Sequence, residues 1–210
     1  ESLRVTLHPK YFPMSSFLSL LRSRRSVRAY KPDPLPKEKI QSILEAGCLA
    51  PSAHNHQPWN FIVITDRETI NRLSFSAQGY LEKRAQASDA LNYFGSEERV
   101  DRVKKRLKLK EDTVFYGAAC LILVVVEKGN EYAPIDCGMM AQNMCLYAKE
   151  HGIASCIIGY ARHIDRRELL HVGMREDQEL MFGMVFGSEA EDSLQKKPDR
   201  DFNKVQKWIE

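Results

Sequence analysis

Long hydrophobic runs are absent from this chain. The longest apolar stretch, AACLILVVV (Ala118–Val126), has the length of a strand, whereas a membrane-spanning helix needs about 20 apolar residues. The first segment, ESLRVTLHPK, also lacks the apolar core of a signal peptide. The sequence therefore predicts a cytoplasmic protein with no membrane partner.

A strong excess of one charge is also missing. The formal net charge of +3 is too small to indicate a nucleic-acid partner by itself. Apolar residues make up 43% and charged residues 28% of the chain, which is typical of a folded globular protein rather than a disordered one. We expect residues 1–210 to form a single domain, because a chain of this length can bury a substantial core.

The cysteines do not form a recognisable framework. There are five of them, an odd number, and no C-x-x-C pair is present. This disfavours both a disulfide scaffold and an iron–sulfur site, and it predicts reduced, mostly buried thiols. Cys120 and Cys156 lie in apolar runs, where we expect them to act as small hydrophobic side chains.

Several familiar catalytic motifs are missing as well. The chain contains no G-x-G-x-x-G, no P-loop, no G-x-S-x-G and no H-E-x-x-H, which excludes the classical Rossmann, kinase and hydrolase classes. His54 and His56 lie two residues apart without a cysteine or carboxylate beside them. Such a pair is a weak zinc signal, so we predict that no metal is bound there.

The elements that are present predict an α+β protein. Helices are expected near Ser16 and Lys37, from about Asp136 to His151, in DRRELLHVG, and through the charged region 66–112. The helix near Asp136 is apolar over most of its circumference, so we expect it to be buried on several sides. Four apolar segments predict the strands of a mixed sheet wrapped by these helices: WNFIVIT, AACLILVVVEK, SCIIGY and ELMFGMVFGS.

A cluster of basic residues, RSRRSVR, follows the first predicted helix. It places Arg24, Arg25 and Arg28 around Ser26, and hydroxyl and guanidinium groups together suit a compact phosphate. A solvated basic turn or a nucleic-acid patch would have the same composition. The residues alone leave these interpretations open.

The loop PSAHNHQPW gathers side chains that can both donate and accept hydrogen bonds. The amides of Asn55 and Gln57 match the alternating edge of a pyrimidine-like ring. The alternative is a loop that ties down its own backbone.

Two later segments are weaker candidates. Gly159 ends the strand SCIIGY, where a glycine either lets the backbone approach a ligand or marks a bulge. Lys196, Lys197 and Arg200 lie in QKKPDR, for which a solvated loop is the simpler interpretation.

Taken together, four motifs resemble the nitroreductase family of FMN-dependent oxidoreductases. They occur in the order RSRRSVRAY, APSAHNHQPWNFIVI, DCGMMAQNMCLYAKEHGIASCIIGY and KKPDR. The resemblance extends from about Phe17 to the C-terminus, although 76–112 contributes little to it and is expected to form a lid. It implies an intertwined α+β homodimer with one FMN in each of two pockets at the subunit interface.

The resemblance also assigns roles to residues. It implies that Arg28 faces the pyrimidine end of the flavin and that His54 lies near the substrate channel. It implies that the partner subunit contributes the loop that begins at Pro51. The FMN-binding residues that it implies are Arg24, Arg25, Ser26, Arg28, Pro51, Ser52, Ala53, Asn55, Gln57, Ile158, Gly159, Lys197 and Arg200, with Lys196 as a register alternative to Lys197.

The implied activity is the transfer of two electrons from NADH or NADPH to a nitroaromatic, quinone or related small acceptor. A ping-pong mechanism is expected, with no catalytic residue from the protein. The tail 190–210, with Phe202, Val205 and Trp208, is expected to embrace the partner. The alternatives are a non-catalytic nucleic-acid-binding protein and a specialised reductive enzyme of the same fold, such as a dehalogenase.

Overall fold

The computed structural model describes residues 16–107 and 112–191, together with residues 193, 200, 201, 204 and 206. The predictions made for Lys196, Lys197, Phe202, Val205 and Trp208 therefore lie outside the described residues.

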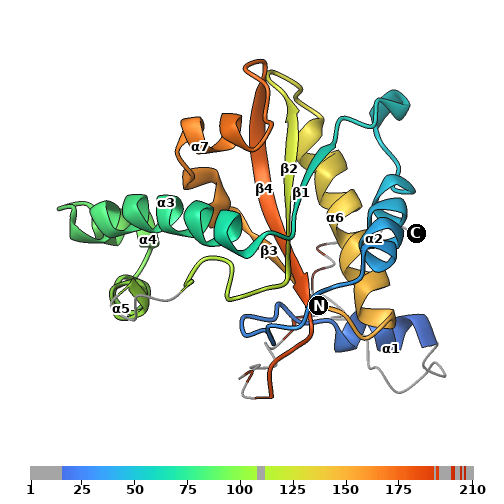
Figure 1. Cartoon of the computed structure of the whole chain (residues 1–210), viewed down its shortest axis with the longest axis horizontal. Coiled ribbons are helices and arrows are strands. Elements are labelled where there is room, and N and C mark those ends of the chain that lie inside the picture. Colours follow the sequence, from blue (N-terminus) through green and yellow to red (C-terminus); the bar gives the residue numbers. More distant parts are fainter. Residues whose placement is uncertain are drawn as a thin grey trace.

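A four-stranded sheet forms the centre of the protein (Figure 1). Its order is β1-β2-β4-β3, and the ladders between these strands are antiparallel. A parallel bridge between Ser26 and Ser155 adds the segment after the first helix to the outer edge of β3. The four predicted strands and the α+β class are confirmed. The strands are β1 (Asn60–Ile64), β2 (Cys120–Glu127), β3 (Ala154–Ile158) and β4 (Gln178–Gly187).

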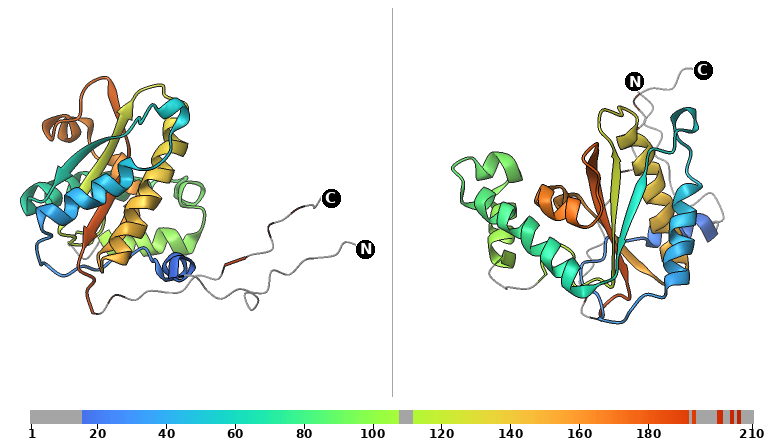
Figure 2. Two further views of the ribbon diagram at one scale, coloured as in Figure 1. Left: turned by 90° about the vertical axis from the view of Figure 1, so that its right-hand side faces the viewer. Right: turned by 45° about the horizontal axis from the view of Figure 1, so that its top comes forward.

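Helices cover both faces of the sheet. Figure 1 shows one group of helices on the right of the sheet and another on the left, with two short helices at the far end of α3. Figure 2 shows the same arrangement from two other directions. The right-hand group is α1 (Ser16–Ser23), α2 (Lys37–Cys48) and α6 (Ala133–Glu150). The left-hand group is α3 (Arg67–Gln86), η2 (Gly159–His163) and α7 (Arg166–His171), and the short helices beyond α3 are α4 (Ala90–Phe94) and α5 (Glu97–Leu107).

The central strand β2 explains the two apolar cores. Alternate side chains of a strand point to opposite faces, so Leu121 and Leu123 join the core beneath α3, whereas Ile122 and Val124 join the core beneath α2 and α6. Because helices cover both faces, β2 needs an uninterrupted apolar sequence.

The cysteines are free in the described structure, and four of the five are buried, as predicted. Burial raises the pKa of the Cys120 thiol to about 12, so this side chain stays protonated and unreactive at neutral pH. None of the helices among the described residues combines the length and the apolar character that crossing a membrane requires.

Candidate flavin-binding site

The basic segment after α1 runs beside the edge strand β3. The backbone N–H of Val27 donates to the carbonyl of Ser155 at 3.0 Å, and the Val27 side chain is buried. This anchor leaves Arg24 and Arg25 half-buried beside β3 and Arg28 exposed. The local sequence therefore places its arginines at the surface of the sheet edge because the valine between them is held in the core.

Arg25 and Arg28 also stabilise this segment. The Arg25 guanidinium donates to the carbonyls of Arg22 and Arg24 at 2.6 and 2.7 Å. The Arg28 guanidinium donates to the carbonyl of Ser26 at 3.2 Å. Each guanidinium has five N–H donors, so both side chains retain donors for an anionic ligand.

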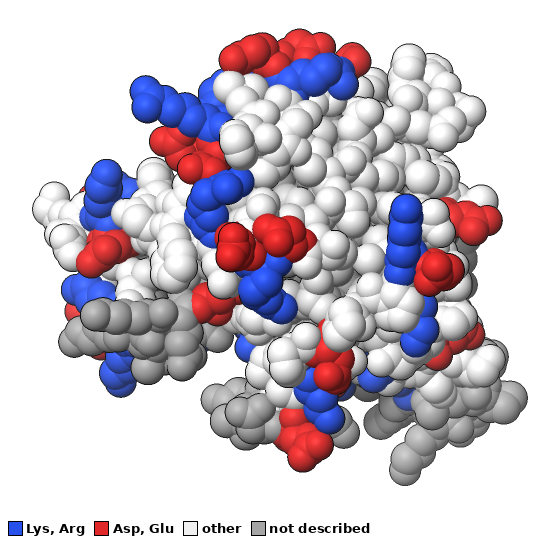
Figure 3. Space-filling model, viewed as in Figure 1, with Lys and Arg blue, Asp and Glu red and all other residues white. Residues whose placement is uncertain are grey.

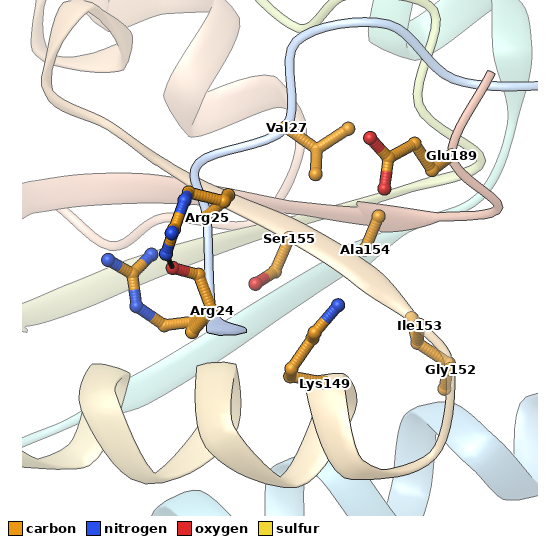
Figure 4. A pocket seen from close by; sticks show the side chains of 9 residues that line it. All are labelled: Arg24, Arg25, Val27, Lys149, Gly152, Ile153, Ala154, Ser155 and Glu189. Atoms are coloured by element: carbon orange, nitrogen blue, oxygen red, sulfur yellow. Dashed lines mark hydrogen bonds between the residues drawn. The ribbon is translucent and has the colours of Figure 1, made fainter. Parts of the chain in front are cut away.

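A small pocket lies between this segment and the start of β3 (Figure 4). It brings together the predicted Arg24 and Arg25 with Lys149, from the last turn of α6, which the sequence analysis missed. The pocket thus has three basic side chains and one acidic side chain. Its lining residues are Arg24, Arg25, Val27, Lys149, Gly152, Ile153, Ala154, Ser155 and Glu189.

The loop between α2 and β1 has an unusual backbone. His54, Asn55 and Gln57 have φ angles of 51°, 56° and 45°, a left-handed region that non-glycine residues rarely occupy. The Ser52 hydroxyl accepts from the Gln57 N–H at 2.9 Å, and the Gln57 amide donates to Asn55 Oδ1 at 3.2 Å. The loop therefore does tie down its own backbone, while the side chains from His54 to Gln57 stay exposed.

Asp136 holds this loop from the first turn of α6. Both carboxylate oxygens accept from the Ala53 N–H, at 3.3 and 3.2 Å, although the residue is only 3% exposed. Sequence reasoning used Asp136 only as a helix boundary. Its signal was an acidic residue in the first turn of an otherwise apolar helix, a position where the helix dipole favours negative charge.

The loop and the pocket lie at opposite ends of α6. Asp136 contacts the loop and Lys149 lines the pocket, and the rise of an α-helix separates these two positions by about 20 Å. Within one chain, the predicted residues Pro51, Ser52 and Ala53 are therefore distant from Arg24 and Arg25.

The end of β3 is open at Gly159. Ile158 pairs with Gly183 without any register shift in the β3–β4 ladder, so the bulge that was the alternative explanation for Gly159 does not form there. A side chain built at Gly159 would meet no atom within 4 Å, so packing within the chain does not require glycine. The glycine instead leaves the backbone accessible where the edge strand ends.

The remaining predicted residues are less constrained. Arg200 is exposed, and its convergence with Lys197 stays a prediction. Among the described residues, no group of three or more histidine, cysteine or acidic side chains is arranged to hold a metal.

A second cluster of side chains, which the sequence analysis missed, follows Gly159. The Tyr93 hydroxyl and His163 Nε2 are hydrogen-bonded at 2.6 Å, and Tyr80 stacks on the His163 ring at 4.1 Å. Burial and the nearby Arg162 lower the pKa of His163. This cluster connects α3 and α4 to η2.

A model of the family described as "Nitroreductase family" matches residues 21–188. The chain belongs to the nitroreductase family. This confirms the predicted resemblance, and it makes the chain an enzyme of the oxidoreductase class. The alternative of a non-catalytic nucleic-acid-binding protein is thereby overturned.

Individual nitroreductase relatives agree with this assignment. The chain is 28% identical to the nitrobenzene nitroreductase of Ectopseudomonas oleovorans in an alignment 206 residues long, which covers 83% of this chain and 88% of that protein. It is 46% identical to an NADH dehydrogenase of Thermus thermophilus over 56 residues, which cover 27% of each chain. The fold matches a nitroreductase of Bacteroides fragilis with bound FMN at a TM-score of 0.76 and 26% identity, covering 93% of this chain and 100% of that one.

Proposed function

We propose that this nitroreductase binds FMN and transfers two electrons from NADH or NADPH to a nitroaromatic, quinone or related small acceptor. The observation that carries this proposal is the basic pocket of Arg24, Arg25 and Lys149 beside the open edge of β3. The names of the relatives support the donor and the acceptor class.

The residues of the pocket fit the phosphate end of FMN. A phosphate ester carries nearly two negative charges at neutral pH, and the pocket has three cations and one carboxylate. Bound phosphate would therefore balance the charge of the pocket. Guanidinium groups also match the geometry of phosphate oxygens.

The path from the pocket to the end of β3 fits the rest of the cofactor. Ser26 and Arg28 follow Arg25 along the edge strand, and Gly159 is exposed directly after the buried Ile158 at its end. When bound, FMN supplies a carrier of two electrons. Arg28 is suited to stabilise the negative charge of its reduced form, because a fixed cation favours the charged state.

A homodimer would complete this site. Large apolar side chains are exposed on the helices of one face of the sheet, where a single chain leaves them in water: Phe17 (59% exposed) on α1, Leu49 (78%) after α2 and Ile135 (64%) on α6. The predicted burial of α6 on several sides is met against α1, α2 and the sheet, whereas Ile135 and Met139 stay exposed. A second copy packed on α6 would cover these residues and bring its loop, with Pro51, Ser52, Ala53, Asn55 and Gln57, to the distant pocket.

In this proposal His54 contacts the acceptor, and the region 76–112 covers the bound acceptor. The proposal includes no nucleic-acid partner. On the face drawn in Figure 3 positive and negative side chains are interspersed, which does not provide the single-sign surface that a polyanion requires.

The first test is whether the purified protein binds FMN and consumes NADH or NADPH only when an acceptor is added. A nitroaromatic, a quinone and a halogenated aromatic should be compared, because the last would reveal a dehalogenase. A colourless protein that takes up no FMN on reconstitution would overturn the proposal.

A ping-pong mechanism is expected because donor and acceptor share one site. The sequence contains no separate dinucleotide-binding motif, so the donor has to leave before the acceptor enters. Initial rates measured at several fixed acceptor concentrations should give parallel double-reciprocal lines. Lines that intersect would show that both molecules are bound at once.

A further inference from the structure

Lys149 is the basic residue of the pocket that neither the local motif nor the family resemblance assigns. It comes from the last turn of α6, on the opposite side of the pocket from Arg24 and Arg25. In Figure 4 its ammonium group points toward β3, and the Ser155 side chain lies between it and the Arg24 guanidinium.

Lys149 forms no ion pair within the described part of the chain, although the Glu189 carboxylate lines the same pocket. Among the described residues, no hydrogen bond or ion pair involves the Lys149 ammonium or the Arg24 guanidinium. Cations that face the same recess repel one another. An anion bound between them would remove this repulsion.

The usual role of a lysine at a helix C-terminus does not explain this side chain. Such a lysine interacts favourably with the helix dipole and the last carbonyl groups. Lys149 instead extends from the helix toward β3 and into the pocket (Figure 4). Its direction indicates a ligand rather than a helix cap.

We propose that Lys149 binds the phosphate of FMN together with Arg24 and Arg25, and that it makes the pocket selective for a terminal phosphate monoester. This inference rests on the proposed function, namely that FMN binds here. The backbone of Gly152, Ile153 and Ala154 lines the pocket beside Lys149. The phosphate therefore meets protein where the second nucleotide of FAD would have to continue.

The test compares FMN with riboflavin, which lacks the phosphate. Apoprotein in phosphate-free buffer is titrated with each flavin, and binding is followed by quenching of flavin fluorescence. Lys149→Ala should raise the Kd for FMN about tenfold, as the loss of one charged hydrogen bond implies, and should leave the Kd for riboflavin unchanged. Lys149→Arg should keep most of the FMN affinity.

Two further variants control for the removal of a lysine as such and for misfolding. Lys83→Ala removes an exposed lysine from α3, far from the pocket, and should bind both flavins like the parent. Lys149→Gln keeps most of the apolar stem, so it tests the charge even if Lys149→Ala folds poorly.

The outcomes separate the two proposals. A parent protein that binds neither flavin would overturn the proposed function. Unchanged FMN affinity in Lys149→Ala would overturn only the role of Lys149. An equal loss of affinity for FMN and for riboflavin would also overturn that role, because it would indicate a purely structural effect. A parent protein that binds FAD as tightly as FMN would overturn the selectivity for a monoester.

Discussion

Three non-glycine residues of the loop after α2, His54, Asn55 and Gln57, hold positive φ angles. Backbone conformations of this kind cost about 1–3 kcal/mol each and persist only where surrounding contacts enforce them. Here the enforcing contacts come from Ser52 and from the buried carboxylate of Asp136. Strain concentrated in one exposed loop supports a role in ligand binding.

Replacing Asp136 should therefore weaken FMN binding. Asp136→Ala leaves the Ala53 N–H without its acceptor, which costs about 1–3 kcal/mol, and it frees the loop from α6. We expect a raised Kd for FMN in a fluorescence titration and faster proteolysis of the loop. Asp136→Asn retains one acceptor oxygen and should recover part of the FMN affinity and part of the resistance to proteolysis. If FMN affinity is unchanged in Asp136→Ala, this loop does not contact the flavin.

Some of these site residues could be predicted from the sequence and others could not, for a physical reason. Arg24 and Arg25 stand in a dense basic cluster that a solvated surface does not require, so they were detectable. Lys149 and Asp136 each occupy the end of a helix where their charge is favourable in any protein. Only the tertiary structure shows that one faces a pocket and the other a loop.

At the scale of elements, the contact between η2 and the helices α3 and α4 involves a half-buried histidine. His163 stacks on Tyr80 and shares a hydrogen bond with Tyr93, and burial lowers its pKa below the usual 6.5. The folded protein therefore holds this histidine in its neutral form.

This contact predicts a loss of stability in mild acid. The unfolded chain takes up a proton on His163 at about pH 6.5, whereas the folded chain takes it up only at lower pH. The free energy of unfolding should fall as the pH decreases below 6.5. Urea denaturation at pH 7.5 and pH 5 should show a smaller pH dependence for His163→Gln than for the parent.

His171→Gln, an exposed histidine on the neighbouring helix α7, is the matched control and should keep the parent's pH dependence. The same dependence in both variants would show that His163 is not the titrating group.

The elements themselves were largely predictable. The four strands follow from their apolar runs, but the order β1-β2-β4-β3 does not, because pairing between distant segments leaves no local signal. α6 begins at Ala133, slightly before the predicted Asp136, since Pro134 is compatible with the first turn of a helix. The region 66–112 was predicted as helical, and the structure divides it at Ala87 and Gly95.

At the scale of the whole molecule, the exposed apolar residues Phe17 on α1, Leu49 after α2 and Ile135 on α6 predict self-association. Ile135→Glu places a charge on α6, where a dimer would bury it, so we expect the variant to sediment as a monomer and to lose FMN. Leu91→Glu makes the same change at an exposed leucine of α4 and should leave both properties intact. A monomeric Ile135→Glu protein that retains FMN fully would show that each chain holds its cofactor alone.

The position of Asp136 and Lys149 at opposite ends of one helix has a genetic consequence. In the proposed dimer each chain gives its pocket to one site and its loop to the other. Arg24→Ala damages only the pocket, and Asp136→Ala only the loop, so either homodimer has two defective sites. Co-expression of the two variants should complement, because the mixed dimer contains one undamaged site beside one that carries both defects. Co-expression of Arg24→Ala with Lys149→Ala should not restore activity. Both substitutions damage the pocket, so each site of the mixed dimer contains a damaged pocket.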